Sequence, residues 1–210
     1  MAEAVTFPGM VTDWGQLYRD NIDAVCALTE ALSEDQLSTP VPATPAWTVR
    51  DVVAHLAGGG NDAVTGRMDG APGPTWTARH VGERVELPLA ELRAELRRNQ
   101  DAVAAGVADN PRPALVWDAA VHHTDLHEAL GLEVADDRFW RPVLEGVAPM
   151  LLERAGADRP DVAPYELFRG LFSRRSRAQM RAWGGDTLSA EQLDGLCLFG
   201  PREDDQPIPA

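Results

Sequence analysis

The sequence predicts an all-α protein in which four long helices surround one core. Apolar residues recur every three to four positions over several long segments, which is the period of an amphipathic helix. No segment shows the alternation of apolar and polar residues, enriched in β-branched side chains, that a half-buried strand requires. With 210 residues, the chain can bury a real core as one domain, or as one domain with a small appendage.

Two long helices are predicted in the first third of the chain. Apolar and aromatic residues recur at helical spacing over residues 12–32. A connector over residues 37–46 follows, where three prolines exclude continued helix. Thr48 and Asp51 then form a capping box that begins a second helix. A Gly-Gly-Gly run inside this helix predicts a bend or a break before the helix ends near Met68.

The next segment, residues 70–86, is rich in proline and glycine and predicts a loop or lid. Its Trp76 and His80 can line the site from a lid or pack the loop, and we favour packing. A third long helix follows over residues 88–108, with leucines on one face and charged residues on the other. Two prolines open the fourth long helix, and Gly131 ends it.

Further helices are predicted in the last third of the chain. Residues 140–155 and 165–183 each carry apolar side chains at helical spacing. Ser189 and Gln192 cap a last short helix. The acidic, proline-rich end of the chain predicts a disordered tail.

The composition excludes several classes of function. A net charge of −14 argues against broad binding of nucleic acid or anionic membranes. All 19 basic residues are arginine, so a Schiff-base lysine is excluded. Cys26 and Cys197 form no metal-binding or redox spacing, and no signal peptide or membrane span is evident. We therefore expect a reduced, cytoplasmic protein.

The segment 117–131 carries the clearest chemical signal. On the predicted helix, Asp118 and His122 are four residues apart and share one face, which Asp125 continues. His55 lies in another predicted helix and can supply a third ligand. A catalytic divalent-metal site commonly uses three protein ligands and keeps one position open for water or substrate. These residue types therefore predict a metal site.

Other interpretations of these histidines stay open at this point. His123 and His127 form a second pair four residues apart, rotated by about 100° from the first, and can be the ligands instead. A carboxylate and an imidazole at this spacing also occur as an ordinary surface pair. His55 can equally be a core histidine whose partner is Asp51.

Three runs of residues, in this order, resemble motifs of the mycothiol-dependent maleylpyruvate isomerase family in the DinB/YfiT-like superfamily. Pro-Ala-Trp-Thr-Val-Arg-Asp-Val-Val-Ala-His-Leu-Ala-Gly, residues 45–58, resembles its first metal-binding helix. Asp-x-x-x-His-x-x-Asp-Leu, residues 118–126, resembles its second motif, where Glu-x-x-x-His supplies two ligands. Glu-Leu-Phe-Arg-Gly-Leu-Phe-Ser-Arg-Arg-Ser-Arg-Ala-Gln, residues 166–179, resembles its C-terminal Gly-Arg-Arg-Ser helix. The resemblance covers residues 10–200.

The resemblance implies a DinB-like four-helix bundle with additional C-terminal helices. We expect a metal-binding bundle over residues 1–160 and a helical extension packed on it over residues 161–200. A disordered tail over residues 201–210 completes this division.

The resemblance also implies the chemistry of the site. His55, Asp118 and His122 would bind a divalent metal, zinc foremost, and Asp125 would support catalysis. Asp118 stands where the family has glutamate. Relatives use a low-molecular-weight thiol such as mycothiol, which implies a metal-dependent thiol transferase or isomerase acting on a small electrophile. A metal-dependent hydrolase on the same scaffold, or a non-catalytic metal- or ligand-binding module, stays an alternative.

A cluster of arginines between residues 169 and 181 is the one basic patch of the chain. We expect Arg174 and Arg177, on one face of the predicted helix, to bind carboxylates of the substrate or thiol. The alternative is that they balance nearby acidic residues. The expected partners are the small substrate and the thiol, and an apolar helix surface can also pair two copies into a homodimer.

Overall fold

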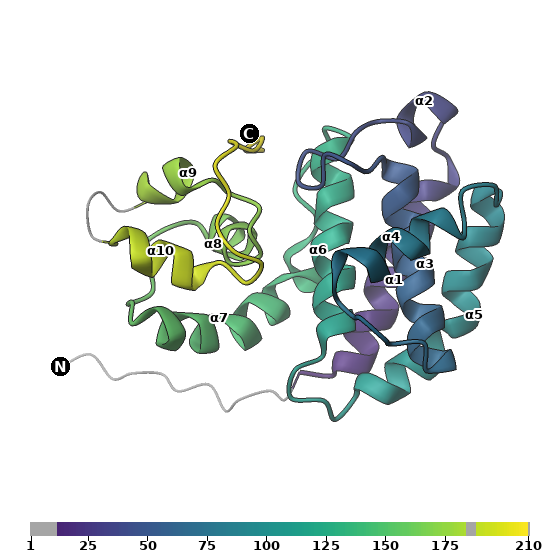
Figure 1. Cartoon of the computed structure of the whole chain (residues 1–210), viewed down its shortest axis with the longest axis horizontal. Coiled ribbons are helices and arrows are strands. Elements are labelled where there is room, and N and C mark those ends of the chain that lie inside the picture. Colours follow the sequence, from purple (N-terminus) through teal and green to yellow (C-terminus); the bar gives the residue numbers. More distant parts are fainter. Residues whose placement is uncertain (1–11, 184–187, 210) are drawn as a thin grey trace.

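The computed structural model describes residues 12–183 and 188–209, and within them the chain is all-α (Figure 1). Within the described ranges, ten α-helices and one short 3-10 turn follow one another. The one β-type pairing among these residues is an isolated bridge between Pro40 and Thr48. The predicted fold class is therefore confirmed. In this part of the chain, no helix is both long and apolar enough to cross a lipid bilayer.

Four long helices form a closed bundle, in which α1 and α3 each contact both α5 and α6. Apolar side chains between them are fully buried, as at Ile22, Val53 and Leu92. A single helical turn, α2 (Glu34–Leu37), lies in the connection between α1 and α3. The four helices are α1 (Trp14–Glu30), α3 (Val49–Thr65), α5 (Leu89–Val107) and α6 (Ala114–Ala129).

Helix α3 begins at the predicted capping box, in which Asp51 accepts from the Thr48 backbone N–H at 2.9 Å. The expected break at its glycines is wrong, because the helix continues without interruption to Thr65. The reason is tertiary packing: α4 lies against this part of α3, with His80 close to Gly58. This packing offsets the poor helix propensity of the glycines.

Residues 70–86 are not a plain loop, because they contain the helix α4 (Pro74–Gly82). Pro74 occupies the first helical position, where its missing N–H costs nothing. Only Trp76 and His80, one turn apart, are buried against α3. Two buried positions give too weak a periodicity to reveal this helix in the sequence.

Helix α6 is enclosed on nearly every side. From Val116 to Leu126, every residue is buried except Asp118. The helix contacts α1 and α3 on one side, and α8 (Pro164–Leu171) pairs with it through charged side chains on another. Asp118 therefore marks the position at which this central helix is open to solvent.

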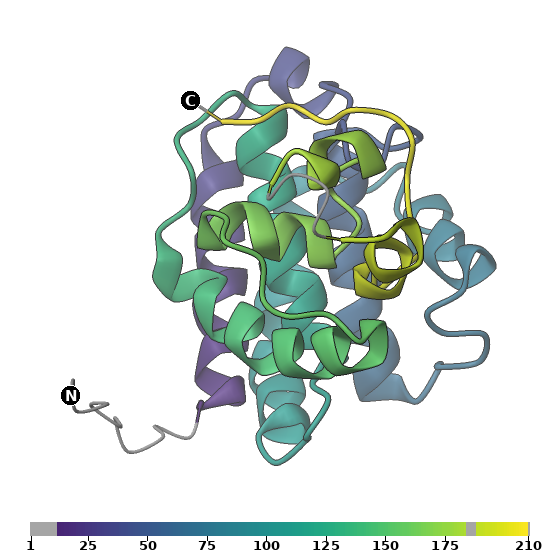
Figure 2. The same ribbon diagram turned by 90° about the vertical axis from the view of Figure 1, so that its left-hand side faces the viewer.

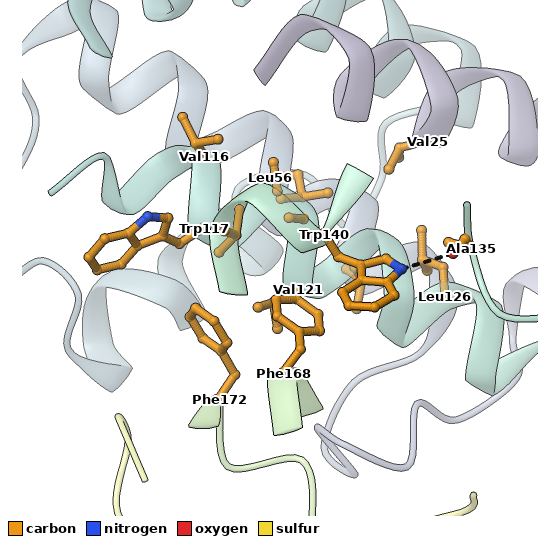
Figure 3. Packing of buried hydrophobic residues seen from close by; sticks show 14 of the residues in the cluster. Val25, Leu56, Val116, Trp117, Val121, Leu126, Ala135, Trp140, Phe168 and Phe172 are labelled. Atoms are coloured by element: carbon orange, nitrogen blue, oxygen red, sulfur yellow. Dashed lines mark hydrogen bonds between the residues drawn. The ribbon is translucent and has the colours of Figure 1, made fainter. Parts of the chain in front are cut away.

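The C-terminal helices lie beside the bundle as a second layer (Figures 1 and 2). Trp140 stacks near Phe168 with ring centroids 5.6 Å apart, and Phe168 and Phe172 face Val121 of α6 (Figure 3). The Trp140 indole N–H donates to the Ala135 carbonyl at 2.9 Å. The helices of this layer are α7 (Arg141–Ala155), which follows the 3-10 turn Asp137–Phe139, α8, α9 (Arg177–Arg181) and α10 (Ala190–Leu196).

The single helix expected over residues 165–183 is wrong. Helix α8 ends at Leu171, Ser173 takes a left-handed φ of 61°, and a capping box at Ser176 starts α9. The chain turns here because Arg174 and Arg175 are directed into the protein, where they pair with acidic residues. Helical spacing in the sequence does not register such buried ion pairs.

The last described residues, 201–209, contain no helix but are tied to α9. The Gln206 backbone N–H donates to the Gln179 side chain at 3.0 Å, and the Gln179 amide donates to the Gln206 carbonyl at 2.6 Å. Arg177 N–H donates to the Arg202 carbonyl at 3.0 Å. The composition predicts disorder here, whereas the structure gives these residues specific hydrogen bonds.

Candidate metal centre

Three of the predicted site residues converge between two helices of the bundle. His55 comes from α3, and Asp118 and His122 come from α6. One ligand atom from each lies within 4.8 Å of the other two. His55 Nε2 is 3.1 Å from Asp118 Oδ2, and His122 Nε2 is 3.5 Å from Asp118 Oδ1. Both histidines are buried, while the Asp118 side chain is 30% exposed. The cluster is therefore closed on its imidazole side and open at Asp118.

His122 is supported from behind by Asp125, one turn further along α6. Asp125 Oδ2 lies 3.0 Å from His122 Nδ1, a close polar contact whose geometry departs from that of a linear hydrogen bond. Burial favours the neutral form of Asp125, but Arg174 and Arg169 hold its pKa well below the ordinary value. An ionised carboxylate only accepts hydrogen bonds, so Nδ1 of His122 carries the proton. The lone pair of His122 Nε2 then faces Asp118.

His55 is supported by a longer chain of contacts. Its Nδ1 lies 3.1 Å from Nδ1 of His80, and His80 Nε2 lies 2.9 Å from Asp62 Oδ2. Burial lowers the pKa of His80, so this ring is neutral. With Asp62 accepting at Nε2, His80 offers a lone pair at Nδ1 to the Nδ1–H of His55. The remaining nitrogen of His55, Nε2, faces Asp118 Oδ2 at a hydrogen-bonding distance of 3.1 Å.

This arrangement fits a divalent cation. Burial by itself would raise the pKa of Asp118, but His55 and His122 lower it to about 2, so the carboxylate is ionised. A divalent cation among these three groups would take the place of the proton in the hydrogen bond between His55 Nε2 and Asp118 Oδ2. Two histidines and one carboxylate, with an open side, form a donor set that catalytic zinc sites use.

The same helices carry a family signature. A sequence model described as the mycothiol maleylpyruvate isomerase N-terminal domain matches residues 18–145, from α1 into α7. The chain belongs to this family. No curated protein and no solved structure gives a significant match. The predicted resemblance is thus confirmed, and the helical bundle agrees with the all-α, DinB-like fold of the mycothiol maleylpyruvate isomerase N-terminal domain.

Asp125, expected to act in catalysis, is fully buried in this family member. It lies behind His122 and between two arginines, with Arg169 Nη2 at 2.7 Å from its Oδ1 and Arg174 Nη2 at 2.9 Å from its Oδ2. Such a carboxylate cannot touch a substrate. Its contact within the site is with His122 Nδ1, at 3.0 Å.

Arg174 and Arg177, expected to bind substrate or thiol, are engaged with protein groups instead. Arg174 pairs with Asp125 and donates to the Phe172 carbonyl at 2.8 Å. Arg177 lies on α9 and pairs with Asp194 at 2.6 Å. The two side chains do not share a helical face, because the chain turns between them. The alternative that these arginines balance acidic residues describes their contacts.

The second histidine pair has different partners. His123 Nδ1 contacts Asn21 Oδ1 at 3.1 Å, and His127 Nδ1 donates to the Glu133 carbonyl at 2.7 Å. Burial, followed by the neighbouring His127, lowers the pKa of His123 to about 3. Among the described residues, these two histidines have no third donor that would complete a metal site. They serve as structural side chains.

Aromatic rings form the walls of the centre. The Trp47 ring lies 4.9 Å from the ring of His55 and 5.9 Å from that of His122. Trp76 of α4 meets His55 edge-on at 6.2 Å. The sequence interpretation of His80 as loop packing missed its contact with His55. A usable signal was Asp62, which follows His55 by seven residues and so shares its face of α3.

Proposed function

We propose that this chain is a metal-dependent enzyme that activates a low-molecular-weight thiol for reaction with a small electrophile. The thiol is mycothiol or a close analogue, and the reaction is an addition, an isomerisation or a transfer of the sulfur group. The observation that carries the proposal is the convergence of His55, Asp118 and His122, each imidazole with its Nε2 directed to the same point. Membership of the mycothiol maleylpyruvate isomerase N-terminal domain family supports the thiol.

In this proposal, each residue of the centre has a distinct task. His55 and His122 hold a divalent ion, zinc foremost, through neutral imidazole nitrogens. Asp118 contributes negative charge and leaves the open side, where its partial exposure gives access to solvent. When bound, such an ion supplies Lewis acidity that lowers the pKa of a coordinated thiol and keeps it as the reactive thiolate. Trp47 shields the two imidazoles from water.

The cysteines of the chain support the need for an external thiol. Cys26 is fully buried, and Cys197 is 3% exposed. Burial raises the pKa of both thiols, that of Cys197 to about 11. A thiol in such surroundings is protonated near neutral pH and is a poor nucleophile. The reactive sulfur is therefore supplied by a second molecule.

The test begins with metal binding and continues with thiol binding. Protein purified without added metal is titrated with Zn²⁺ and with Co²⁺ against a competing chelator, and mycothiol is then added to the Co²⁺ form. We expect about one ion per chain and a new sulfur-to-cobalt absorption band. His122→Ala should abolish both signals. Absence of metal uptake by the parent protein would refute the proposal.

Two further outcomes would support a different function for this chain. Turnover of an ester or amide substrate without any thiol would support a hydrolase on the same scaffold. Metal binding with no thiol band and no turnover would support a binding module.

A further inference from the structure

The helix α4 contributes a buried histidine to the back of the metal centre. We propose that His80 is a positioning residue, which fixes His55 in the tautomer and orientation whose Nε2 faces Asp118 and His122. His80 is fully buried, with its Nδ1 3.1 Å from His55 Nδ1. This inference rests on the proposed function in one respect, namely that His55 is a metal ligand.

The direction of these hydrogen bonds follows from Asp62, the group in this series of contacts that lies farthest from the metal centre. Asp62 Oδ2 lies 2.9 Å from His80 Nε2 and accepts a second hydrogen bond from Arg79 Nη2 at 2.5 Å. A carboxylate oxygen facing two donors cannot donate, so the proton lies on His80 Nε2. The 3.1 Å between the two Nδ1 atoms leaves room for one shared proton, and the proposal places it on His55 with His80 Nδ1 as its acceptor.

The consequence concerns the nitrogen of His55 that can bind a metal. With its other proton held at Nδ1, His55 can offer the Nε2 lone pair to a metal, which would replace the hydrogen bond between Nε2 and Asp118 Oδ2 at 3.1 Å. The opposite tautomer would place a hydrogen at Nε2 and block ligation. Asp125 contacts the ligand His122 directly. Asp62 supports the ligand His55 in the same way, but indirectly, through His80.

Gly58 is the residue that permits this contact. A Cβ added at Gly58 would lie 2.5 Å from both Cβ and Cγ of His80, a distance that real side chains do not show. The neighbouring Gly59 is different, because a Cβ there meets Trp76 at an ordinary 3.7 Å. The first glycine of the run is thus specific for the approach of His80, and the second is not.

These two glycines provide a matched pair of variants for a test that leaves both histidines in place. Gly58→Ala should displace His80 and weaken Zn²⁺ binding by roughly 10- to 100-fold, the range found for groups that support metal ligands. Gly59→Ala should bind Zn²⁺ as the parent does. Both affinities are measured by chelator competition, after circular dichroism has established that each variant is helical. Equal affinities for the two variants would overturn the proposal.

If Gly58→Ala does not fold, substitutions of His80 itself decide the question. His80→Gln retains an acceptor for His55 and a donor for Asp62, whereas His80→Leu retains neither. We expect Gln to preserve more of the Zn²⁺ affinity than Leu. Equal loss in both would mean that His80 only fills space.

A spectroscopic measurement separates this proposal from the wider function. In protein labelled with ¹⁵N-histidine, we expect a protected Nδ1–H signal for His55 and a scalar coupling from it to His80 Nδ1. The spectrum is recorded with and without Zn²⁺. A proton at His55 Nε2 with Nδ1 bare would refute the proposed positioning, even if metal binds. Failure of metal binding with the expected His55 signal intact would refute the function and leave the hydrogen-bond chain standing.

Discussion

Asp125 and His122 form a contact of 3.0 Å between Oδ2 and Nδ1, at a depth where the Asp125 side chain has no exposure and the His122 side chain has 5%. The Asp125 carboxylate also pairs with Arg169 and Arg174, which follow the bundle in the sequence. The C-terminal layer is thereby connected to a proposed ligand through one buried carboxylate. Damage to this connection should affect both stability and metal binding.

The first prediction concerns Asp125 itself. Asp125→Asn should lower Zn²⁺ affinity by roughly 10- to 100-fold, because a neutral amide replaces the charged carboxylate beside His122 Nδ1. It should also destabilise the fold by about 3–5 kcal/mol, because two buried guanidinium groups lose their shared counter-charge. Chelator competition and urea unfolding measure the two effects. Asp194→Asn, which breaks a more exposed pair with Arg177, is the control. An unchanged Zn²⁺ affinity in Asp125→Asn would contradict the assigned role.

The second prediction separates the two arginines of the sequence-based site. Arg174→Met should destabilise the protein by on the order of 3 kcal/mol and weaken metal binding, since it leaves Arg169 as the remaining partner of Asp125. Arg177→Met should leave metal affinity and thiol binding unchanged, because Arg177 of α9 pairs with Asp194 of α10, within the C-terminal layer. Loss of thiol binding in Arg177→Met, with normal folding, would restore the original expectation for that residue.

The third prediction concerns the carboxylate ligand. Asp118→Asn removes the negative charge and should reduce Zn²⁺ affinity by more than the roughly 10- to 100-fold typical of supporting groups. Asp118→Glu should retain binding, because Asp118 is 30% exposed and its open side accommodates one more methylene. Zn²⁺ titrations of the two variants under identical conditions compare the effect of the carboxylate charge with the effect of side-chain length. Binding by Asn as tight as that of the parent would exclude Asp118 as a ligand.

The fourth prediction concerns the cysteines and alkaline pH. Cys26 and Cys197 should react with an aromatic disulfide reagent only after unfolding, because both thiols are buried and protonated. The pKa of Cys197 rises from an ordinary value of 9.0 to about 11 in the folded state. The unfolded chain therefore loses this proton first. The contribution of the thiol to stability is complete below pH 9 and is lost between pH 9 and pH 11.

Urea unfolding at pH 8, 9, 10 and 11 measures this loss, with Cys197→Ala as the comparison. The parent should lose more stability than the variant across that interval. Rapid labelling of the native protein at pH 7 would contradict the assignment and would make an internal thiol a candidate nucleophile.

Local patterns in the sequence determined the elements of the bundle. The apolar period of α1, α3, α5 and α6 is set within each helix, and so is the capping box of Thr48 and Asp51. The placement of Asp118 and His122 on one face also follows from helix geometry alone. Their encounter with His55 was predicted from ligand chemistry and from resemblance, and the tertiary structure brings the three together.

Two features were decided only by the tertiary structure, because they depend on contacts between residues that are distant in the chain. His80 became part of the centre because Gly58 lets α4 lie against α3. Arg174 lies inward, with its Nη2 2.9 Å from Oδ2 of the buried Asp125 on α6. The apolar period of a helix indicates which of its faces is buried. It does not indicate which charged or polar group of a neighbouring helix contacts that face. Burial makes such pairings strong, and burial is a property of the assembled fold.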